Sequence, residues 1–482
     1  MANGYTWALF AFVAIASLIA LQRWRVGLLL CIVAGLLQDP IRKVTPGTPA
    51  YLVMAFVPIY LAMFLGLLKE RFVFRDFFRE YPQSLIVAQL FFLSLAVSSI
   101  QTLSYGAEAV FAILVGLTFY VGWIPAFFLG FYFLRKSYRE LERPLILFGV
   151  LTSIMLVGAP LEYLGVKFSE PWLGTVSLTS EWKRWYSITG WVAMISGFYR
   201  APEIMAWHAA TLVIVAIYLV VRRPALTLLW VAEAVWGLSC VFLGGRRKMF
   251  FMVFIFAGLL LLLSESRRRG GMFFYLVFIS AVVLFASLLF VDARYLETAE
   301  SGLSTADVRL THHAVSGPVW LFGIVGPFGY GVGTKAQGTQ HLTVEMADTP
   351  LIEGGFEKVL VELGVVGAMV LLVFAGSMVR LVILAFRRVG PARMDSTPLA
   401  ALAAFLLANV MAYLVAFQVY GDPLICFFLG FALGLVLSAS RLVRTDVAAR
   451  AALAGAEAQP SEGVVATPAL RGPTRLAGPA GT

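Results

Sequence analysis

The sequence has little charge for its length of 482 residues, because Asp, Glu, Lys and Arg together make up only 13% of it. A soluble domain carries about 25% charged residues, so this composition excludes a water-soluble enzyme. The chain has three cysteines and four histidines, too few for a disulfide scaffold or a cysteine-rich metal domain. Cys31, Cys240 and Cys426 all lie in apolar runs, and we interpret them as packed thiols.

Hydrophobic residues make up 60% of the sequence, and the mean hydropathy is +0.87. One water-soluble chain cannot bury so much apolar surface, so the sequence predicts a polytopic membrane protein. A helix needs roughly 20 apolar residues to cross a bilayer. Runs that meet or approach this length begin near Tyr5, Val26, Ala50, Ser84, Glu108, Leu145, Met205, Ala225, Met249, Met272, Phe356, Pro398 and Pro423. We therefore predict an all-α transmembrane helix bundle of about 12 to 13 spans, because the second run, 26–37, is short enough to be a half-span.

The net charge of +10 comes from short basic clusters between the apolar runs. This pattern orients membrane proteins and does not indicate nucleic-acid binding. When the runs alternate across the bilayer, the more basic set of short loops faces the cytoplasm. The C-terminus is then cytoplasmic, and two long loops, 166–204 and 291–355, lie on the outer face. Residues 1–444 form the predicted transmembrane domain, and the Ala/Gly/Pro-rich segment 445–482 is predicted to be a disordered cytoplasmic tail.

Two clusters of charge lie at predicted outer ends of spans. Arg200 and Glu203 flank a proline suited to the first turn of a helix, although the residues alone slightly favour an interfacial aromatic belt with an arginine that faces the headgroups. Further on, Arg246, Arg247 and Lys248 follow two glycines and run against the positive-inside bias. Lipid phosphates or a diphosphate-linked substrate would balance these cations, and the alternative is snorkelling to lipid headgroups.

The second long loop holds a third cluster. Arg309 precedes the adjacent His312 and His313, and Trp320 stands before a run rich in glycine and aromatic residues, 326–335. Such a run suits a flat surface for a saccharide. Adjacent side chains on an α-helix diverge by about 100°, so no metal site is expected at the two histidines.

A fourth cluster, acidic in character, leads into the span that begins near Phe356. His341 is followed by Glu353, Glu357 and Glu362. A spacing of about four residues places carboxylates on one helix face, and carboxylates at the mouth of a span are costly unless they are used or paired. The alternative interpretation is that they pair with the nearby arginines.

These motifs resemble the bacterial O-antigen ligase and O-antigen polymerase superfamily over roughly residues 80–440. The family phrases are G-x-F-x-x-P-N, Gly/Ser-Arg, an Arg before P-x-x-G-x-G, and H-N-x-x-L-x-x-x-x-E-x-G-x-x-G. In the same order, the matching segments of this sequence are Gly197-Phe198 with Pro202-Glu203, then Gly245-Arg246-Arg247, then Arg309 with Pro327 to Gly331, and finally Glu353 to Gly367. The family's His and Asn fall on Glu353 and Gly354, which argues against a lipopolysaccharide ligase.

The resemblance implies a glycosyltransferase of the bacterial inner membrane. It would polymerise, or ligate, oligosaccharide repeat units carried on undecaprenyl or another polyprenyl diphosphate, at the outer face, in exopolysaccharide or O-antigen biosynthesis. With the clusters above, it indicates catalytic roles for Glu353, Arg309 and His341. Diphosphate or sugar binding is expected of Arg200, Arg246, Arg247, Trp320 and Glu357. No cofactor or metal is expected, and a flippase and a chain-length regulator are candidate partner proteins.

Two other classes of protein stay open. A transporter or flippase of lipid-linked sugars would need charged residues at mid-membrane depth. The candidates Glu162, Glu233 and Arg380 are not spaced as a relay, and charge is concentrated at the predicted outer rim instead. A non-catalytic scaffold of a polysaccharide assembly complex is compatible with every motif above.

Overall fold

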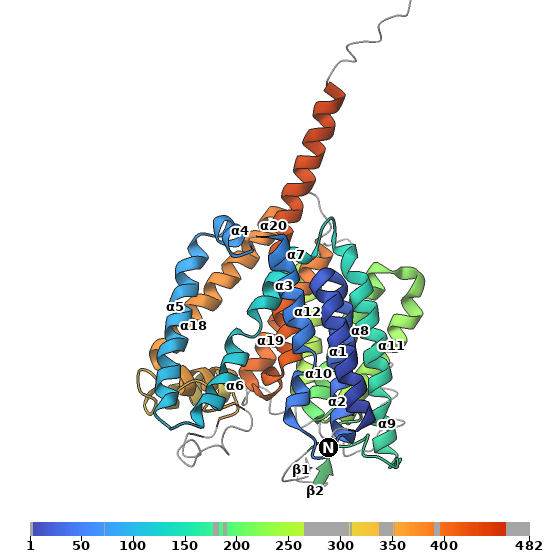
Figure 1. Ribbon diagram of the computed structural model, residues 1–482, viewed down its shortest axis with the longest axis vertical. Coiled ribbons are helices and arrows are strands. Elements are labelled where there is room, and N and C mark those ends of the chain that lie inside the picture. The colour runs from blue at the N-terminus through green and yellow to red at the C-terminus, as the bar shows by residue number, and fades with distance from the viewer. Residues whose placement is uncertain are drawn as a thin grey trace, which may run out of the picture.

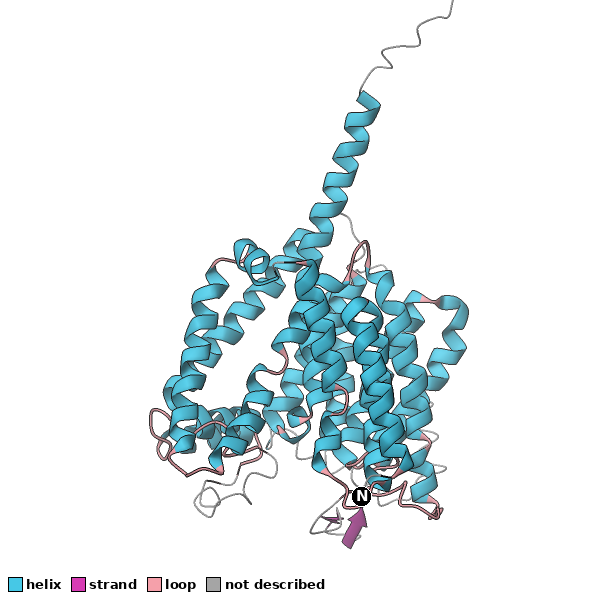
Figure 2. Ribbon diagram, in the orientation of Figure 1, coloured by secondary structure: helices cyan, strands magenta, loops and turns pink. Residues whose placement is uncertain are grey.

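The computed structural model describes residues 3–71, 73–176, 183–186, 190–264, 308, 311–336, 350, 352–389 and 396–458. Within them the chain is an all-α bundle with one short antiparallel hairpin, in which β1 (Lys183–Tyr186) pairs with β2 (Gly190–Ala193). The long helices run roughly along one axis (Figure 2). Eleven helical segments of the described residues are long and apolar enough to cross a membrane, which confirms the predicted fold class.

Successive long helices alternate in direction, so the connections fall at two ends of the bundle (Figure 1). The helices before the hairpin are α1 (Gly4–Gln22), α2 (Trp24–Val44), η1 (Ala50–Met54), α3 (Val57–Glu70), α4 (Val73–Glu80), α5 (Gln83–Leu103), α6 (Ala109–Val121), α7 (Ile124–Phe133), η2 (Tyr138–Leu141), α8 (Glu142–Leu156) and α9 (Gly158–Tyr163). The helices after it are α10 (Pro202–Arg222), η3 (Pro224–Leu226), α11 (Thr227–Leu243), α12 (Arg247–Leu263), η4 (His312–Ser316), α16 (Gly317–Phe322), α18 (Gly355–Val389), α19 (Thr397–Val415), η6 (Gln418–Gly421) and α20 (Pro423–Ala458).

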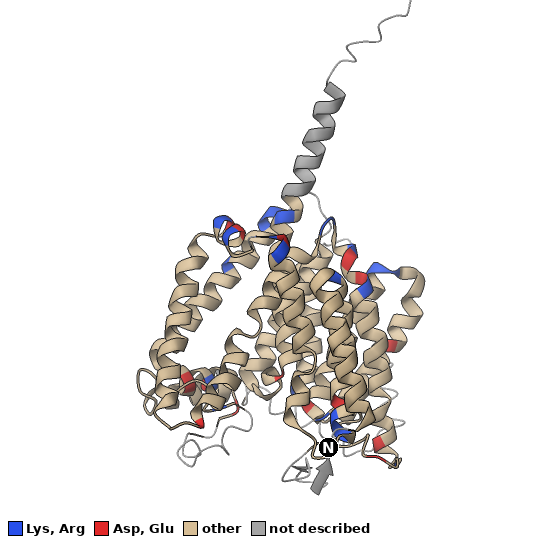
Figure 3. Cartoon of the chain, in the orientation of Figure 1, with Lys and Arg blue, Asp and Glu red and all other residues tan. Residues whose placement is uncertain are grey.

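The two ends of the bundle differ in what they carry. The hairpin end holds β1, β2, the N-terminus and the described parts of both long loops, whereas α20 projects from the opposite, tail end (Figure 1). Charged residues of the described part of the chain lie mostly at the two ends of the bundle, and few lie in its middle (Figure 3). This distribution is typical of helices that cross a bilayer.

The helices divide into a main bundle and a side group. In the main bundle α10 packs on α8, α11 and α12, and 94% of the residues in its most apolar stretch are buried. The side group contains α5, α6, α16 and the first turns of α18, and it has its own apolar core around Phe91, Leu321 and Val361. Figure 1 shows α5 and α18 side by side at one edge of the molecule.

Most predicted spans are confirmed at their expected places. The run near Met249 corresponds to α12, which has 17 residues, and the run near Met272 lies outside the described residues. The second run was predicted as a span or a half-span, and the half-span alternative was wrong, because α2 is a full helix of 21 residues that is long and apolar enough to cross a membrane. The polar residues that end the apolar run, among them Asp39 and Lys43, are buried and have partners elsewhere in the bundle.

The predicted start of the disordered tail was also wrong. The last helix continues to Ala458, beyond the predicted boundary at residue 445. The segment 445–458 is rich in alanine, which is the strongest helix former. The remainder of the predicted tail, 459–482, lies outside the described residues.

The glycine-rich run 326–335 joins α18 to its neighbours. The helix α18 is interrupted at Gly364, where φ is 69° and ψ is −174°, and the run supplies donors to carbonyls near the break. Tyr330 N donates to Val361 O at 2.7 Å, and Gly331 N donates to Glu362 O at 3.0 Å. Three glycines of the run have positive φ and lie against the backbones of α5, α6 and α18. The glycines at 329, 331 and 333 are thus packed between helices, whereas residues 326–328 are exposed, and the saccharide surface predicted for this run stays a prediction.

Replacing Gly364 by alanine is expected to destabilise the protein by about 1–3 kcal/mol. A Cβ at this position of positive φ would meet backbone atoms of Gly329 and Phe328. The matched control is Gly376→Ala in the same helix, where a Cβ meets nothing within 4 Å and alanine is about 1 kcal/mol better than glycine. Thermal denaturation of both purified variants in one detergent gives the comparison. Equal melting temperatures for Gly364→Ala and wild type would contradict a required break at this position.

Candidate functional site

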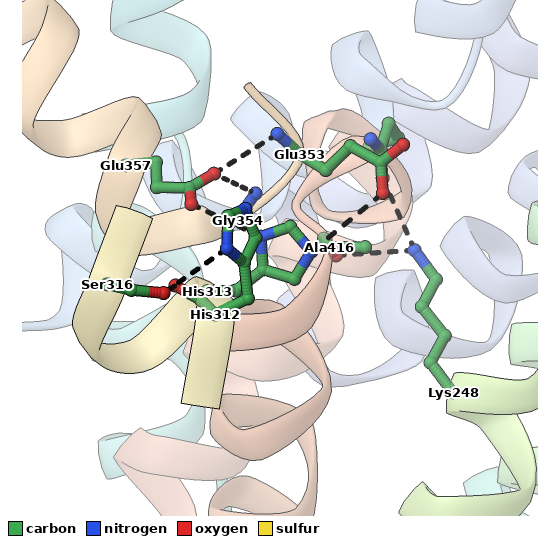
Figure 4. A network of polar contacts seen from close by, with 9 residues as sticks. Lys248, His312, His313, Ser316, Glu353, Gly354, Glu357 and Ala416 are labelled. Atoms are coloured by element: carbon green, nitrogen blue, oxygen red, sulfur yellow. Dashed lines mark hydrogen bonds and ion pairs between the residues drawn. The ribbon is translucent and has the colours of Figure 1, made fainter. Parts of the chain in front are cut away.

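An open pocket lies at the hairpin end, between the main bundle and the side group. Its volume is about 830 Å³, and its polar lining consists of His312, His313, Ser316, Glu353, Glu357 and Gln418. These residues come from η4, from the start of α18 and from η6, which are far apart in the sequence. Figure 4 shows the polar network that joins them and the approach of Lys248 from α12.

The carboxylate of Glu353 is presented to this pocket on a fixed backbone. Glu353 N donates to Glu357 Oε2 at 3.2 Å, and Glu353 O accepts from Phe417 N at 3.1 Å. Its side chain is 64% exposed, and Oε2 lies 4.0 Å from Nε2 of His313. The main chain is therefore positioned while the carboxylate stays accessible to a bound molecule, an arrangement that favours function.

The buried Glu357 anchors the start of α18. Its Oε2 accepts from the backbone N–H groups of Glu353 and Gly354, the latter at 2.8 Å, and its Oε1 lies 3.2 Å from His313 Nδ1. Because one nitrogen of His313 pairs with Glu357, the other faces the Glu353 carboxylate. The predicted binding residue Glu357 thus lines the pocket, but it is mostly engaged in holding its neighbours.

The adjacent histidines behave differently from the expectation for an α-helix. Both rings face the Glu357 side chain (Figure 4), and one ligand atom from each histidine lies within 4.8 Å of the other and of a Glu357 oxygen. The histidines begin a π-helical turn, which is wider than an α-helical turn, so consecutive side chains diverge less. No sequence pattern marks a π-helical turn, and this convergence could not be predicted.

A second group of charges comes from the N-terminal end of α12. Arg246 forms an ion pair with Glu203 in the first turn of α10. Lys248 Nζ donates to Ala416 O at 3.2 Å and lies 3.5 Å from Gln418 Oε1.

These groups form one charged strip, which we define as Glu203, Arg246, Lys248, Glu353 and His313. Lys248 interacts electrostatically with Glu203, Arg246 and Glu353, and it lies on the other side of the Glu353 carboxylate from His313 (Figure 4). The strip runs from α10 to η4 and brings together one residue or more from each of the four clusters identified in the sequence. Lys248 and His313 belong to the predicted clusters, but no catalytic or binding role was predicted for either of them.

Arg200 lies outside the strip and forms ion pairs with two carboxylates. Its Nη1 donates to Asp39 Oδ1 at 2.8 Å, and its Nη2 donates to Asp422. Burial alone would lower the pKa of Arg200, but attraction to Asp39 and Asp422 outweighs it and raises the pKa above its ordinary value. Since the two carboxylates already neutralise its charge, Arg200 ties α2, α10 and α20 together and is poorly placed to bind a phosphate.

Of the other predicted site residues, the structure describes the side chain of Trp320 alone. Trp320 lines the pocket and is 58% exposed, which suits stacking on a ligand. Arg247 is the first residue of α12, and its side chain lies outside the described part of the chain. Arg309 and His341 also lie outside the described residues.

The fold and the pocket define this chain as a multi-pass α-helical membrane protein with a charged site at one end of its bundle. No protein-family model matches the sequence, and no curated protein is significantly similar to it. Because a fold alone does not specify an activity, the function is inferred from the chemistry of the pocket.

Proposed function

We propose that this chain is a glycosyltransferase of the bacterial inner membrane that polymerises, or ligates, oligosaccharide repeat units carried on polyprenyl diphosphate. The hairpin end would face outward, and the C-terminus would lie in the cytoplasm. The observation that carries the proposal is the exposed Glu353 carboxylate, held by its backbone between His313 and Lys248 in an open pocket. Glycosyl transfer from a diphosphate needs a base for the acceptor hydroxyl and cations for the leaving group.

In the proposed step, the acceptor hydroxyl oxygen attacks the anomeric carbon of the donor sugar. The new glycosidic C–O bond forms as the bond from that carbon to the diphosphate oxygen breaks, and the bonding electrons leave with polyprenyl diphosphate. The hydroxyl proton passes to Glu353. Arg246 and Lys248 neutralise the charge that develops on the leaving group, and the exposed ring of Trp320 supports a sugar in the pocket.

The contacts of Glu162 and Glu233, the two carboxylates considered for a pathway through the membrane, argue against a flippase. Glu162 Oε2 accepts from the backbone N–H groups of Ser196 and Gly197, at 3.1 Å and 2.7 Å. Glu233 accepts a hydrogen bond from Ser153 Oγ. Both carboxylates have local structural partners, whereas the carboxylate of Glu353 is exposed in the pocket.

The proposal is tested by deleting the gene in its own bacterium and analysing the surface glycan and the lipid-linked intermediates. A polymerase predicts loss of long-chain polymer with accumulation of single repeat units on polyprenyl diphosphate at the outer face. Accumulation of these units on the cytoplasmic side would support a flippase instead. Unchanged polymer and intermediates would contradict both.

In a complemented deletion strain, Lys248→Gln is expected to lower polymer yield by about 100-fold, the usual cost of losing one group that stabilises developing negative charge. The matched control is Lys69→Gln. Lys69 is exposed in the last turn of α3, at the tail end of the bundle, so this change should leave polymer yield unchanged. Polymer is measured against the amount of membrane-inserted protein. Wild-type yield from Lys248→Gln would contradict a role for this cation in binding the diphosphate.

A further inference from the structure

Three side chains that commonly ligate metals converge on one wall of the pocket. His312, His313 and Glu357 each offer one ligand atom, and these atoms all lie within 4.8 Å of one another. Two imidazoles and one carboxylate form the ligand set of many catalytic zinc sites, which keep a fourth position open. We propose that these three residues bind a divalent transition-metal ion, zinc in the first place.

The distances fit one ion with a small adjustment. Zinc binds imidazole nitrogen and carboxylate oxygen at about 2.0–2.2 Å, so two ligand atoms of one ion lie roughly 3–4 Å apart. His313 Nδ1 and Glu357 Oε1 already lie 3.2 Å apart. His312 is exposed, so a rotation of its ring can close the remaining gap at low cost. A plain hydrogen bond between His313 and Glu357 would explain their distance, but not the approach of the second ring to the same carboxylate.

Each of the three side chains also has a partner for its other polar atom. His312 Nδ1 lies 3.2 Å from Ser316 Oγ, and Nε2 of His313 lies 4.0 Å from a Glu353 oxygen. Glu357 Oε2 accepts from two backbone N–H groups, those of Glu353 and Gly354. Metal ligands in proteins are usually oriented by such outer contacts. These outer contacts leave Nε2 of His312, Nδ1 of His313 and Oε1 of Glu357 available to bind the ion.

The ligand chemistry selects the class of ion. Magnesium and calcium prefer sets of oxygen ligands, whereas imidazole suits zinc and its neighbours in the first transition series. Because the cluster opens into a pocket of about 830 Å³, a water molecule or a ligand oxygen can fill the fourth position. The role of the ion rests on the proposed function, in which the ion would hold a diphosphate oxygen of the donor. The binding of the ion to the three residues does not depend on that function.

The test measures metal on the full-length protein purified in detergent. The protein is stripped with a chelator, loaded with Zn²⁺ or Co²⁺, and desalted, and the bound metal is measured by mass spectrometry and by the visible absorption of Co²⁺. We expect about one ion per chain for wild type. His312→Gln and His313→Gln are expected to raise the Kd by at least about 100-fold, more than the loss of an outer contact does. Glu353→Gln changes only an outer contact of His313, so it serves as the comparison in the same pocket and should raise the Kd by no more than about 10-fold.

Each outcome decides one question. No metal on wild-type protein, or full occupancy in both histidine variants, overturns the inference. Because His312 is exposed, His312→Gln should fold even where a change at the buried His313 does not, and a monodisperse profile in size-exclusion chromatography checks this. Bound metal without any polymerising activity would leave the metal site standing and refute the proposed function. Polymer formed by chelated, metal-free protein would support the proposed function and refute only the role of the ion in holding the donor diphosphate.

Discussion

Replacing Glu353 by glutamine is expected to abolish glycan polymerisation, with a loss of at least about 100-fold, the usual effect of removing a general base. Glutamine has nearly the same size as glutamate but cannot take the proton of the incoming hydroxyl. The exposed side chain makes few contacts, so the change in the free energy of unfolding should stay within about 0.5 kcal/mol. Polymer length and yield are measured in a complemented deletion strain at matched protein level.

Two variants make this result specific. Glu353→His restores a group that can take a proton and is expected to recover part of the activity. Glu108→Gln replaces another exposed carboxylate, just before α6, and should have no effect. Near-normal polymer from Glu353→Gln would contradict the base role and move it to His341 or Glu357.

Replacing Arg200 by alanine is expected to destabilise the protein by about 3–5 kcal/mol, the usual cost of removing one partner of a buried ion pair. Asp39 and Asp422 are both buried and would be left as two unneutralised carboxylates. The measurement is the melting temperature of the purified protein in detergent, together with the amount of folded protein in the membrane.

A rescue variant distinguishes this structural role from phosphate binding. Adding Asp39→Asn and Asp422→Asn to Arg200→Ala removes the unpaired charges, and should restore part of the lost stability. Conversely, a stable Arg200→Ala protein that has lost only its activity would support the binding role that the sequence predicts for Arg200.

The spans could be predicted because each depends on the composition of its own residues. The start of α10 at Pro202 and that of α20 at Pro423 follow from local preferences. The last turns of α2 could not be predicted, because Asp39 and Lys43 resemble loop residues when considered alone. Their partners, Arg200 and Gly197, lie 161 and 154 residues further along the chain, and only the fold brings them together.

Only part of the candidate site could be predicted from the sequence. Glu353 was predicted from its position before an apolar run and from the family phrase, and it does line the pocket. Its neighbour Lys248 comes from a different helix, and no spacing rule relates residues so far apart. The convergence of His312 and His313 depends on a π-helical turn, for which the sequence offers no signal.

The burial of α10 bears on how this sequence can change over time. Its most apolar stretch is 94% buried, against 22% for α5. On an exposed helix surface one apolar side chain can replace another freely, whereas small residues such as Ala206, Ala209 and Ala210, which are completely buried, leave no room for larger ones. Substitutions should therefore accumulate on α5 and be rejected on α10. Relatives too distant to share recognisable similarity along the whole chain would retain the order of small and large residues in α10.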